Sequence, residues 1–230
     1  MRKKLMLVAG VIAAVGLLAT VAFAAVGVKF TSTLKPNKAG KSAGVSVNFE
    51  SSDPAAPQPP IMNKVQINFQ KGGKFNGKKF PKCTTQILLS KGPSGCPKGS
   101  KIGSGTGVGY AKPVVTDPVN GKLTIFNGGS QILVFVLPDL GPTFVTPCTV
   151  SGGYNLTCNI PPIKTLPSAP DAAVGTVKTK TKALTIKKGK KKIGLVVAPK
   201  KCKGTWKTTA TFSFVGAGPV TATSSQKCKK

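Results

Sequence analysis

Residues 75–107 read FNGKKFPKCTTQILLSKGPSGCPKGSKIGSGTG, and no other stretch of the chain is so unlike simple strand sequence. Cys83 and Cys96 stand at the two ends of a short segment rich in glycine and proline, and a run of small residues follows. On both sides of this stretch apolar residues alternate with small or polar ones, which is the period of half-buried β-strands. We therefore expect a disulfide-closed excursion set between ordinary strands.

The six cysteines of the chain predict a disulfide framework. Six cysteines allow many pairings in principle, and sequence proximity selects Cys83 with Cys96, Cys148 with Cys158, and Cys202 with Cys228. Each pair brackets a turn or a hairpin. The sequence contains no C-x-x-C motif, so it suggests neither a redox motif nor a zinc knuckle.

The first residues have the features of a signal peptide. Arg2, Lys3 and Lys4 are followed by an apolar run, and Ala22-Phe23-Ala24 has the small-x-small pattern of a cleavage site. We expect cleavage after Ala24 and a secreted or cell-surface protein. The apolar run continues to Val28, which is long enough to cross a bilayer, so an uncleaved anchor is the alternative.

The charge balance is strongly basic: 34 Lys+Arg stand against 5 Asp+Glu, and there is no histidine. Arg2 is the one arginine of the sequence, so the basic residues after the signal peptide are all lysines. Lysine is a hydrated point charge, whereas base-specific recognition of nucleic acid depends on the forked guanidinium of arginine. This composition favours diffuse attraction to polyanions and argues against specific nucleic-acid binding.

The patterning predicts an all-β, disulfide-stapled, β-sandwich-like fold of roughly ten to twelve short strands. Residues 65–69 alternate cleanly, and residues 206–214 place their large apolar side chains on one strand face. Residues 132–137 form an unbroken apolar run, which is typical of a strand covered on both faces. We expect that strand near the middle of the core.

The chain is divided by composition into three parts. Residues 1–24 are the helical signal segment, and residues 25–165 form the main β domain. A proline-dense segment at 161–170 has the composition of a linker. Residues 174–230 are expected to form lysine-rich hairpins, either as a small C-terminal β subdomain packed on the main domain or continuous with it.

Four motifs resemble a family of exported, β-rich proteins from soil actinobacteria of the Thermoleophilia type. They are FNGKKFPKC at 75–83, GPSGCPKGSKIGSGT at 92–106, FNGG at 126–129 and WKTTATF at 206–212. The resemblance covers most of the chain after the signal segment, and the block that begins at Cys96 is its most specific part. It implies secretion and a β fold. It implies no activity, because none is assigned to the family.

Two glycine patterns approach nucleotide-binding motifs without matching them. Gly72 and Gly77-Lys78 have the spacing of a P-loop, but Lys79 stands where Ser or Thr must hold magnesium, and Phe80-Pro81 disfavours the helix that must follow. The glycines at 103, 105, 107 and 109 alternate strictly and lack the offsets of a dinucleotide fingerprint. We expect a hairpin loop and a closely approached strand, respectively.

The titratable residues do not suggest catalysis. Asp53, Asp117, Asp139 and Asp171 each neighbour a proline, where aspartate is common in turns, and Glu50 is the remaining carboxylate. Without histidine or an apparent carboxylate pair, general acid–base work, metal catalysis and a Ser-His-Asp triad lack their components. Serine and lysine are abundant, but nothing singles out a reactive pair. We expect no enzymatic activity, no cofactor and no metal.

The lysines are the one feature that attracts a partner by charge alone. Lys178, Lys180 and Lys182 alternate along one strand, and five further lysines surround the expected tip of the next hairpin. The candidate polyanion contacts are Lys178, Lys180, Lys182, Lys187, Lys188, Lys190, Lys191 and Lys192. A second interpretation is that these lysines only prevent edge-to-edge aggregation of exposed strands.

Two functional hypotheses follow from the sequence. The first is a non-catalytic protein of the cell envelope or extracellular space that makes weak contacts with anionic polymers or lipids. The second is a secreted small-ligand-binding protein, or an enzyme, whose site the sequence does not mark. A concave apolar pocket would favour the second hypothesis, and a filled core with a continuous lysine face would favour the first.

Overall fold

The computed structural model of the chain describes residues 26–164 and 170–230. The predicted signal peptide, its cleavage site after Ala24, and residues 165–169 of the proline-dense segment lie outside the described residues. In the part of the chain that is described, no helix is both long enough and apolar enough to cross a membrane.

The described chain is built mainly of strands, and there are more of them than the sequence indicated. The strands are β1 (Gly27–Lys35), β2 (Gly44–Ser52), β3 (Met62–Asn68), β4 (Lys74–Phe75), β5 (Lys101–Ala111), β6 (Val115–Asn127), β7 (Gln131–Pro138), β8 (Phe144–Ser151), β9 (Asn155–Asn159), β10 (Ala173–Thr181), β11 (Thr185–Lys188), β12 (Lys191–Gly194), β13 (Val196–Val197), β14 (Thr205–Phe214) and β15 (Ala217–Lys227). The helical segments are α1 (Thr85–Lys91) and two 3-10 turns, η1 (Gly77–Lys79) and η2 (Pro93–Gly95).

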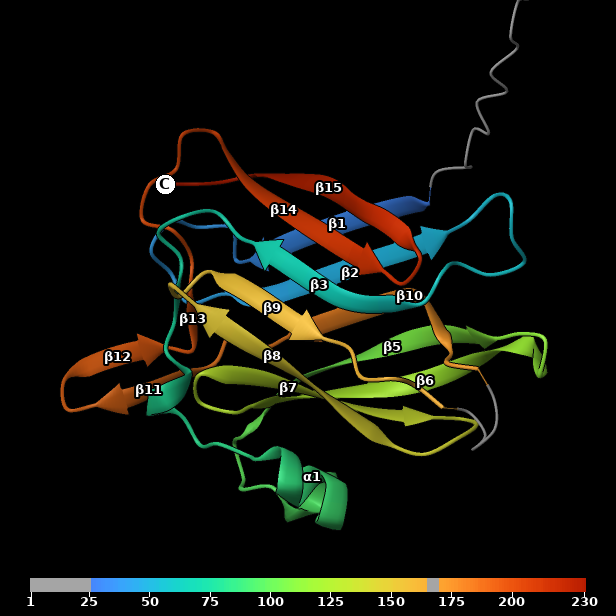
Figure 1. Cartoon of the computed structure of the whole chain (residues 1–230). Coiled ribbons are helices and arrows are strands. Elements are labelled where there is room, and N and C mark those ends of the chain that lie inside the picture. Colours follow the sequence, from blue (N-terminus) through green and yellow to red (C-terminus); the bar gives the residue numbers. More distant parts are fainter. Residues whose placement is uncertain (1–25, 165–169) are drawn as a thin grey trace, which may run out of the picture.

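An 11-stranded antiparallel sheet contains most of these strands, in the order β1-β2-β10-β5-β6-β7-β8-β9-β3-β14-β15. In Figure 1, β1, β2, β3, β14 and β15 form an upper layer, β5 to β8 form a lower one, and β9 and β10 lie between them. The predicted all-β, sandwich-like fold is therefore confirmed. Its two layers belong to one sheet that curls back on itself.

The two edges of this sheet meet, because β1 and β15 are joined through side chains. Gln226 accepts a hydrogen bond from Leu34 N (2.7 Å) through Oε1 and donates one to Leu34 O (2.8 Å) through Nε2. Two residues away, the Ser224 hydroxyl accepts a hydrogen bond from Ser32 N (2.9 Å). These side chains satisfy the backbone groups that an open edge strand would leave unpaired. The sheet is thus closed, and strands surround its interior.

The C-terminal residues complete the sheet. β10 lies between β2 and β5, and the β14–β15 hairpin pairs with β3. Among the C-terminal strands, β11 and β12 form a separate two-stranded sheet, and β13 pairs with β4 in another. Three strands of the C-terminal part, β10, β14 and β15, therefore share the main sheet with strands from residues 26–164.

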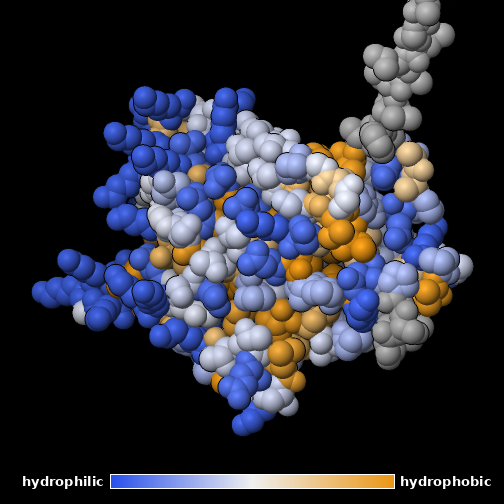
Figure 2. Space-filling view, in the orientation of Figure 1, coloured by the Kyte–Doolittle hydropathy of each residue, from blue (hydrophilic) through white to orange (hydrophobic). Residues whose placement is uncertain are grey.

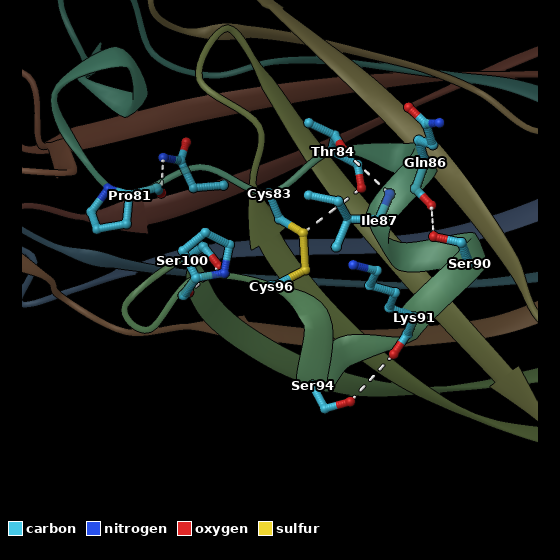
Figure 3. Close-up of a disulfide and its surroundings, with 12 residues drawn as sticks. Pro81, Cys83, Thr84, Gln86, Ile87, Ser90, Lys91, Ser94, Cys96 and Ser100 are labelled. Carbon is cyan, nitrogen blue, oxygen red and sulfur yellow. Dashed lines mark hydrogen bonds between the residues drawn. A yellow bond between two sulfur atoms is a disulfide. The ribbon is translucent and has the colours of Figure 1, made fainter.

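The Cys83–Cys96 segment covers the outer face of the lower layer. Thr84 caps the N-terminus of α1, because its hydroxyl accepts a hydrogen bond from Ile87 N (3.2 Å). The Cys83–Cys96 disulfide ties the two ends of the segment together (Figure 3). Leu88 of α1 is buried in one apolar cluster with Leu133 and Phe135 of β7 and Val145 of β8. The sequence did not indicate α1, because its seven residues are too few to show a helical period.

This cover explains the apolar run at 132–137. Leu133 and Phe135 point outward under α1, whereas Ile132, Val134 and Val136 point into the closed sheet. The prediction of a strand with two apolar faces is therefore confirmed. The two faces of β7 are covered differently: the segment that contains α1 packs on the outer face, and the inner face lines the interior of the closed sheet.

Asn127 fastens the same segment to the end of β6. Its side chain is fully buried, and its Nδ2 atom donates hydrogen bonds to Gly77 O (2.9 Å) and Pro81 O (2.8 Å). Its Oδ1 atom accepts one from Gly129 N (3.1 Å). One side chain thus satisfies backbone groups of the 77–81 segment and of the turn after β6, which form no strand-to-strand hydrogen bonds there.

Candidate functional site

The carboxylates of the chain gather at one end of the sheet, here called the carboxylate end. It is formed by the C-terminal ends of β2, β5 and β7 and the N-terminal ends of β6 and β10, which adjoin because these strands are antiparallel. The acidic residues at or next to these strand ends are Glu50, Asp53, Asp117, Asp139 and Asp171, the full set of 5 in the sequence. One of them, Asp171, is paired with Lys164 (Nζ to Oδ1, 2.9 Å).

The opposite end is rich in exposed lysines and is here called the lysine-rich end. Three segments meet there: Ala39 N donates to Lys229 O (2.9 Å), Ala198 N donates to Lys41 O (2.9 Å), and a disulfide joins Cys202 to Cys228. Figure 2 shows hydrophilic residues gathered over this end and over the hairpin that projects from it. Exposed lysines at this end include Lys35, Lys38, Lys41, Lys187, Lys188, Lys190, Lys191, Lys192, Lys200, Lys201, Lys203, Lys227, Lys229 and Lys230.

The β11–β12 hairpin concentrates this charge at a tip. Lys187 stands directly across from Lys192, and Lys188 across from Lys191, so like charges face each other in both pairs. Such pairs destabilise a hairpin unless an anion neutralises them. The base of the hairpin is held by Ile186 and Ile193, which pack against the buried cluster around Leu195. The hairpin predicted around 187–192 is thus confirmed, and its lysines are exposed.

The other candidate lysines lie on the outer face of the sheet. Lys178 and Lys180 of β10 are exposed on the outside. Val177, which precedes them, and Thr179, which lies between them, line the interior. The predicted alternation along this strand is therefore confirmed. Lys182 follows the strand, is also exposed, and leads to the base of the β11–β12 hairpin. The outer stripe thus runs into the lysine-rich end.

The interior of the closed sheet holds an apolar cavity of about 290 Å³. Strands of both layers contribute to its wall, including Val47 of β2, Val136 of β7 and Val150 of β8. These valines are only half-buried although they point inward. The sequence did not indicate this cavity, since alternation marks which side chains point inward and carries no information on whether they fill the space.

The glycine patterns have structural explanations. Nδ2 of Asn127 hydrogen-bonds Gly77 O, and a side chain at Gly77 would clash with Asn127 and Gly129. A side chain at Gly103 or Gly105 would meet the backbone of β10. The expectation of a closely approached strand is therefore confirmed for β5.

The described residues also contain no cluster of three or more His, Cys, Asp and Glu side chains that could hold a metal ion. The sequence matches no protein-family model and no curated protein. Function is therefore argued below from the charge distribution and the cavity.

Proposed function

We propose that this is an exported, non-catalytic protein that contacts anionic polymers of the cell envelope through its lysine-rich end. The observation that carries the proposal is the separation of charge along the molecule. The acidic residues stand at the carboxylate end, and a large group of exposed lysines gathers at the other end without an acidic neighbour. A field of one sign over one end attracts a polyanion and orients the protein on it.

The chemistry of the contact follows from the side chains. Ammonium groups are hydrated point charges without the geometry to read a base or a sugar, so binding should depend on charge density alone. The facing lysine pairs of the β11–β12 hairpin supply a second reason, because an anion between them removes their mutual repulsion.

For the alternative in which the N-terminal segment stays uncleaved, the place where the chain enters the fold favours polymers over the cell's own membrane as the partner. β1 begins at Gly27, which pairs with Ser52 at the carboxylate end. In a protein retained by its N-terminal segment, the lysine-rich end would then point away from the anchoring bilayer. Polymers that extend through the envelope lie within its reach.

Replacing Lys187, Lys188, Lys190, Lys191 and Lys192 by glutamine should weaken this binding. A matched control replaces five exposed lysines outside the β11–β12 hairpin by glutamine, namely Lys29, Lys82, Lys91, Lys98 and Lys122, so that net charge changes equally. The measurement is a salt titration of affinity for a soluble glycerol-phosphate polymer. Because each lost contact lowers the salt slope by about 1, the hairpin variant should lose more of the slope than the control.

Equal losses in the two variants would mean that net charge alone is responsible, which contradicts the proposed site. If the wild-type protein binds no polymer at low ionic strength, the lysines serve to protect the open edges of the hairpin from aggregation. Parallel titrations with DNA and with anionic vesicles define the partner class. Tighter binding to vesicles than to the polymer would replace the polymer with a lipid surface.

A further inference from the structure

The cavity inside the closed sheet is bounded by apolar side chains from facing layers. Val45 and Val47 of β2 lie in one layer, and Val134 and Val136 of β7 lie in the other. All four point inward and are only half-buried, whereas Phe212 on the inner face of β14 is fully buried. The interior is therefore packed in one region and hollow in another.

The hollow region follows from the strand number and from the residues at inward positions. The interior of a closed sheet widens as strands are added, and eight strands already leave just enough room for side chains to fill. Here 11 strands surround the interior. Many of the inward positions along the cavity carry short side chains, such as Thr179 and Thr181, or none, as at Gly107. These side chains are too short to meet across the sheet.

Protein interiors are normally packed as densely as organic crystals, and empty apolar space destabilises them. A cavity lined by apolar residues of both layers is therefore best explained by an apolar molecule that occupies it. Its volume of about 290 Å³ is near the lower limit for small-molecule sites, which suits one aliphatic chain and not a lipid with several chains.

The ends of the cavity differ in charge. At the carboxylate end the wall includes Leu140, which is 42% exposed, and Pro142. At the other end it includes the exposed Lys74 of β4 and Gln70. An anionic head placed beside Lys74 would also lie in the field of the lysine-rich end.

We propose that the cavity binds a single-chain aliphatic carboxylate, with the chain between the two layers and the carboxylate beside Lys74. This site is separate from the polymer contact and rests on different residues. Loss of either activity therefore says nothing about the other.

The chain contains a natural reporter for this site. Trp206 is the single tryptophan of the sequence; it lines the cavity, and its indole N–H donates to Lys201 O (3.0 Å). It lies toward the lysine-rich end, in the same region as Lys74. Dodecanoate with bromine on the carbon beside the carboxylate should quench its fluorescence more strongly than dodecanoate with bromine on the terminal carbon.

The titration uses the wild-type protein and ligand concentrations below micelle formation. Saturable quenching with the stated order is the expected result. Absence of quenching by either probe overturns the proposal. The reverse order keeps the chain in the cavity but overturns the placement of the carboxylate at Lys74.

Two variants locate the site. Val136→Phe should fill the cavity, so it should lower affinity for the brominated chain at least about tenfold without lowering the melting temperature. Val114→Phe adds the same ring to a valine that is 47% exposed and should change neither quantity. A lower melting temperature for Val136→Phe alone means that the interior is already filled, and unchanged affinity means that the chain binds elsewhere. Either result overturns the proposal.

The head group is tested by Lys74→Gln. This variant should weaken binding of dodecanoate and leave binding of dodecanol, measured by displacement of the brominated chain, unchanged. Equal effects on acid and alcohol contradict the role of Lys74.

Discussion

Replacing Asn127 by alanine should destabilise the protein by about 4 kcal/mol and lower its melting temperature by about 10 °C. The side chain is fully buried and donates to the carbonyls of Gly77 and Pro81, and more weakly to that of Phe80 at 3.4 Å. Without it these acceptors, and the N–H of Gly129, stay buried without their partner. Each such group costs about 1–3 kcal/mol, which is why one amide has so large an effect.

Chemical denaturation measures this change directly. Asn127→Asp is the informative second variant, because it keeps the volume and the Oδ1 acceptor but loses the donors, so it should also be strongly destabilised. The exposed Asn68 is the control, since Asn68→Ala should change stability by less than about 0.5 kcal/mol. Stability within about 1 kcal/mol of wild type for Asn127→Ala would mean that Asn127 does not hold the 77–81 segment to β6.

Replacing Phe212 by alanine should cost about 3–5 kcal/mol of stability. Its ring is fully buried and contacts two aromatic rings of neighbouring strands: the centroid distances are 6.1 Å to Phe30 and 5.1 Å to Phe49. These ring contacts join β14 to β1 and β2 inside the closed sheet. They add to the hydrogen bonds by which Ser224 and Gln226 of β15 join the edge of β1. The variant should lose both packing and closure.

Thermal and denaturant unfolding measure the loss, and hydrogen exchange identifies where it acts. Protection should fall most in β1 and β15, because these are the strands that meet at the seam. Val215→Ala, at a position 55% exposed in the next turn, is the control and should be near neutral. Uniform loss of protection across the sheet would contradict the role of Phe212 at the seam.

The features that the sequence predicted correctly depend on near neighbours. The three disulfides join the cysteine pairs chosen by proximity, because each pair spans a local turn or hairpin. Cys148 and Cys158 even stand opposite each other on adjacent strands. The face formed by alternate residues of 206–214 and the run at 132–137 were readable because strand period is a local property.

The features that the sequence did not predict depend on which distant strands meet. β10 inserts between β2 and β5, and Gln226 hydrogen-bonds Leu34, from which it is far apart in the sequence. The local sequence pattern of these segments does not indicate which distant strand each one contacts. The cavity is a consequence of that closure, because its size is set by the number of strands around it. The separation of charge also depends on contacts between distant strands. The sequence contains every lysine, but the strand order determines at which end of the sheet each lysine lies.

The most direct test of the proposed function is to map where an anionic polymer contacts the protein. The measurement is a backbone amide NMR titration of the wild-type protein with a soluble glycerol-phosphate polymer at low ionic strength. The account predicts shifts concentrated at residues 38–41, 185–194 and 200–203, reversed by salt, with little change around Glu50, Asp139 and Asp171. Shifts spread evenly over the surface, or centred on the carboxylate end, would contradict it.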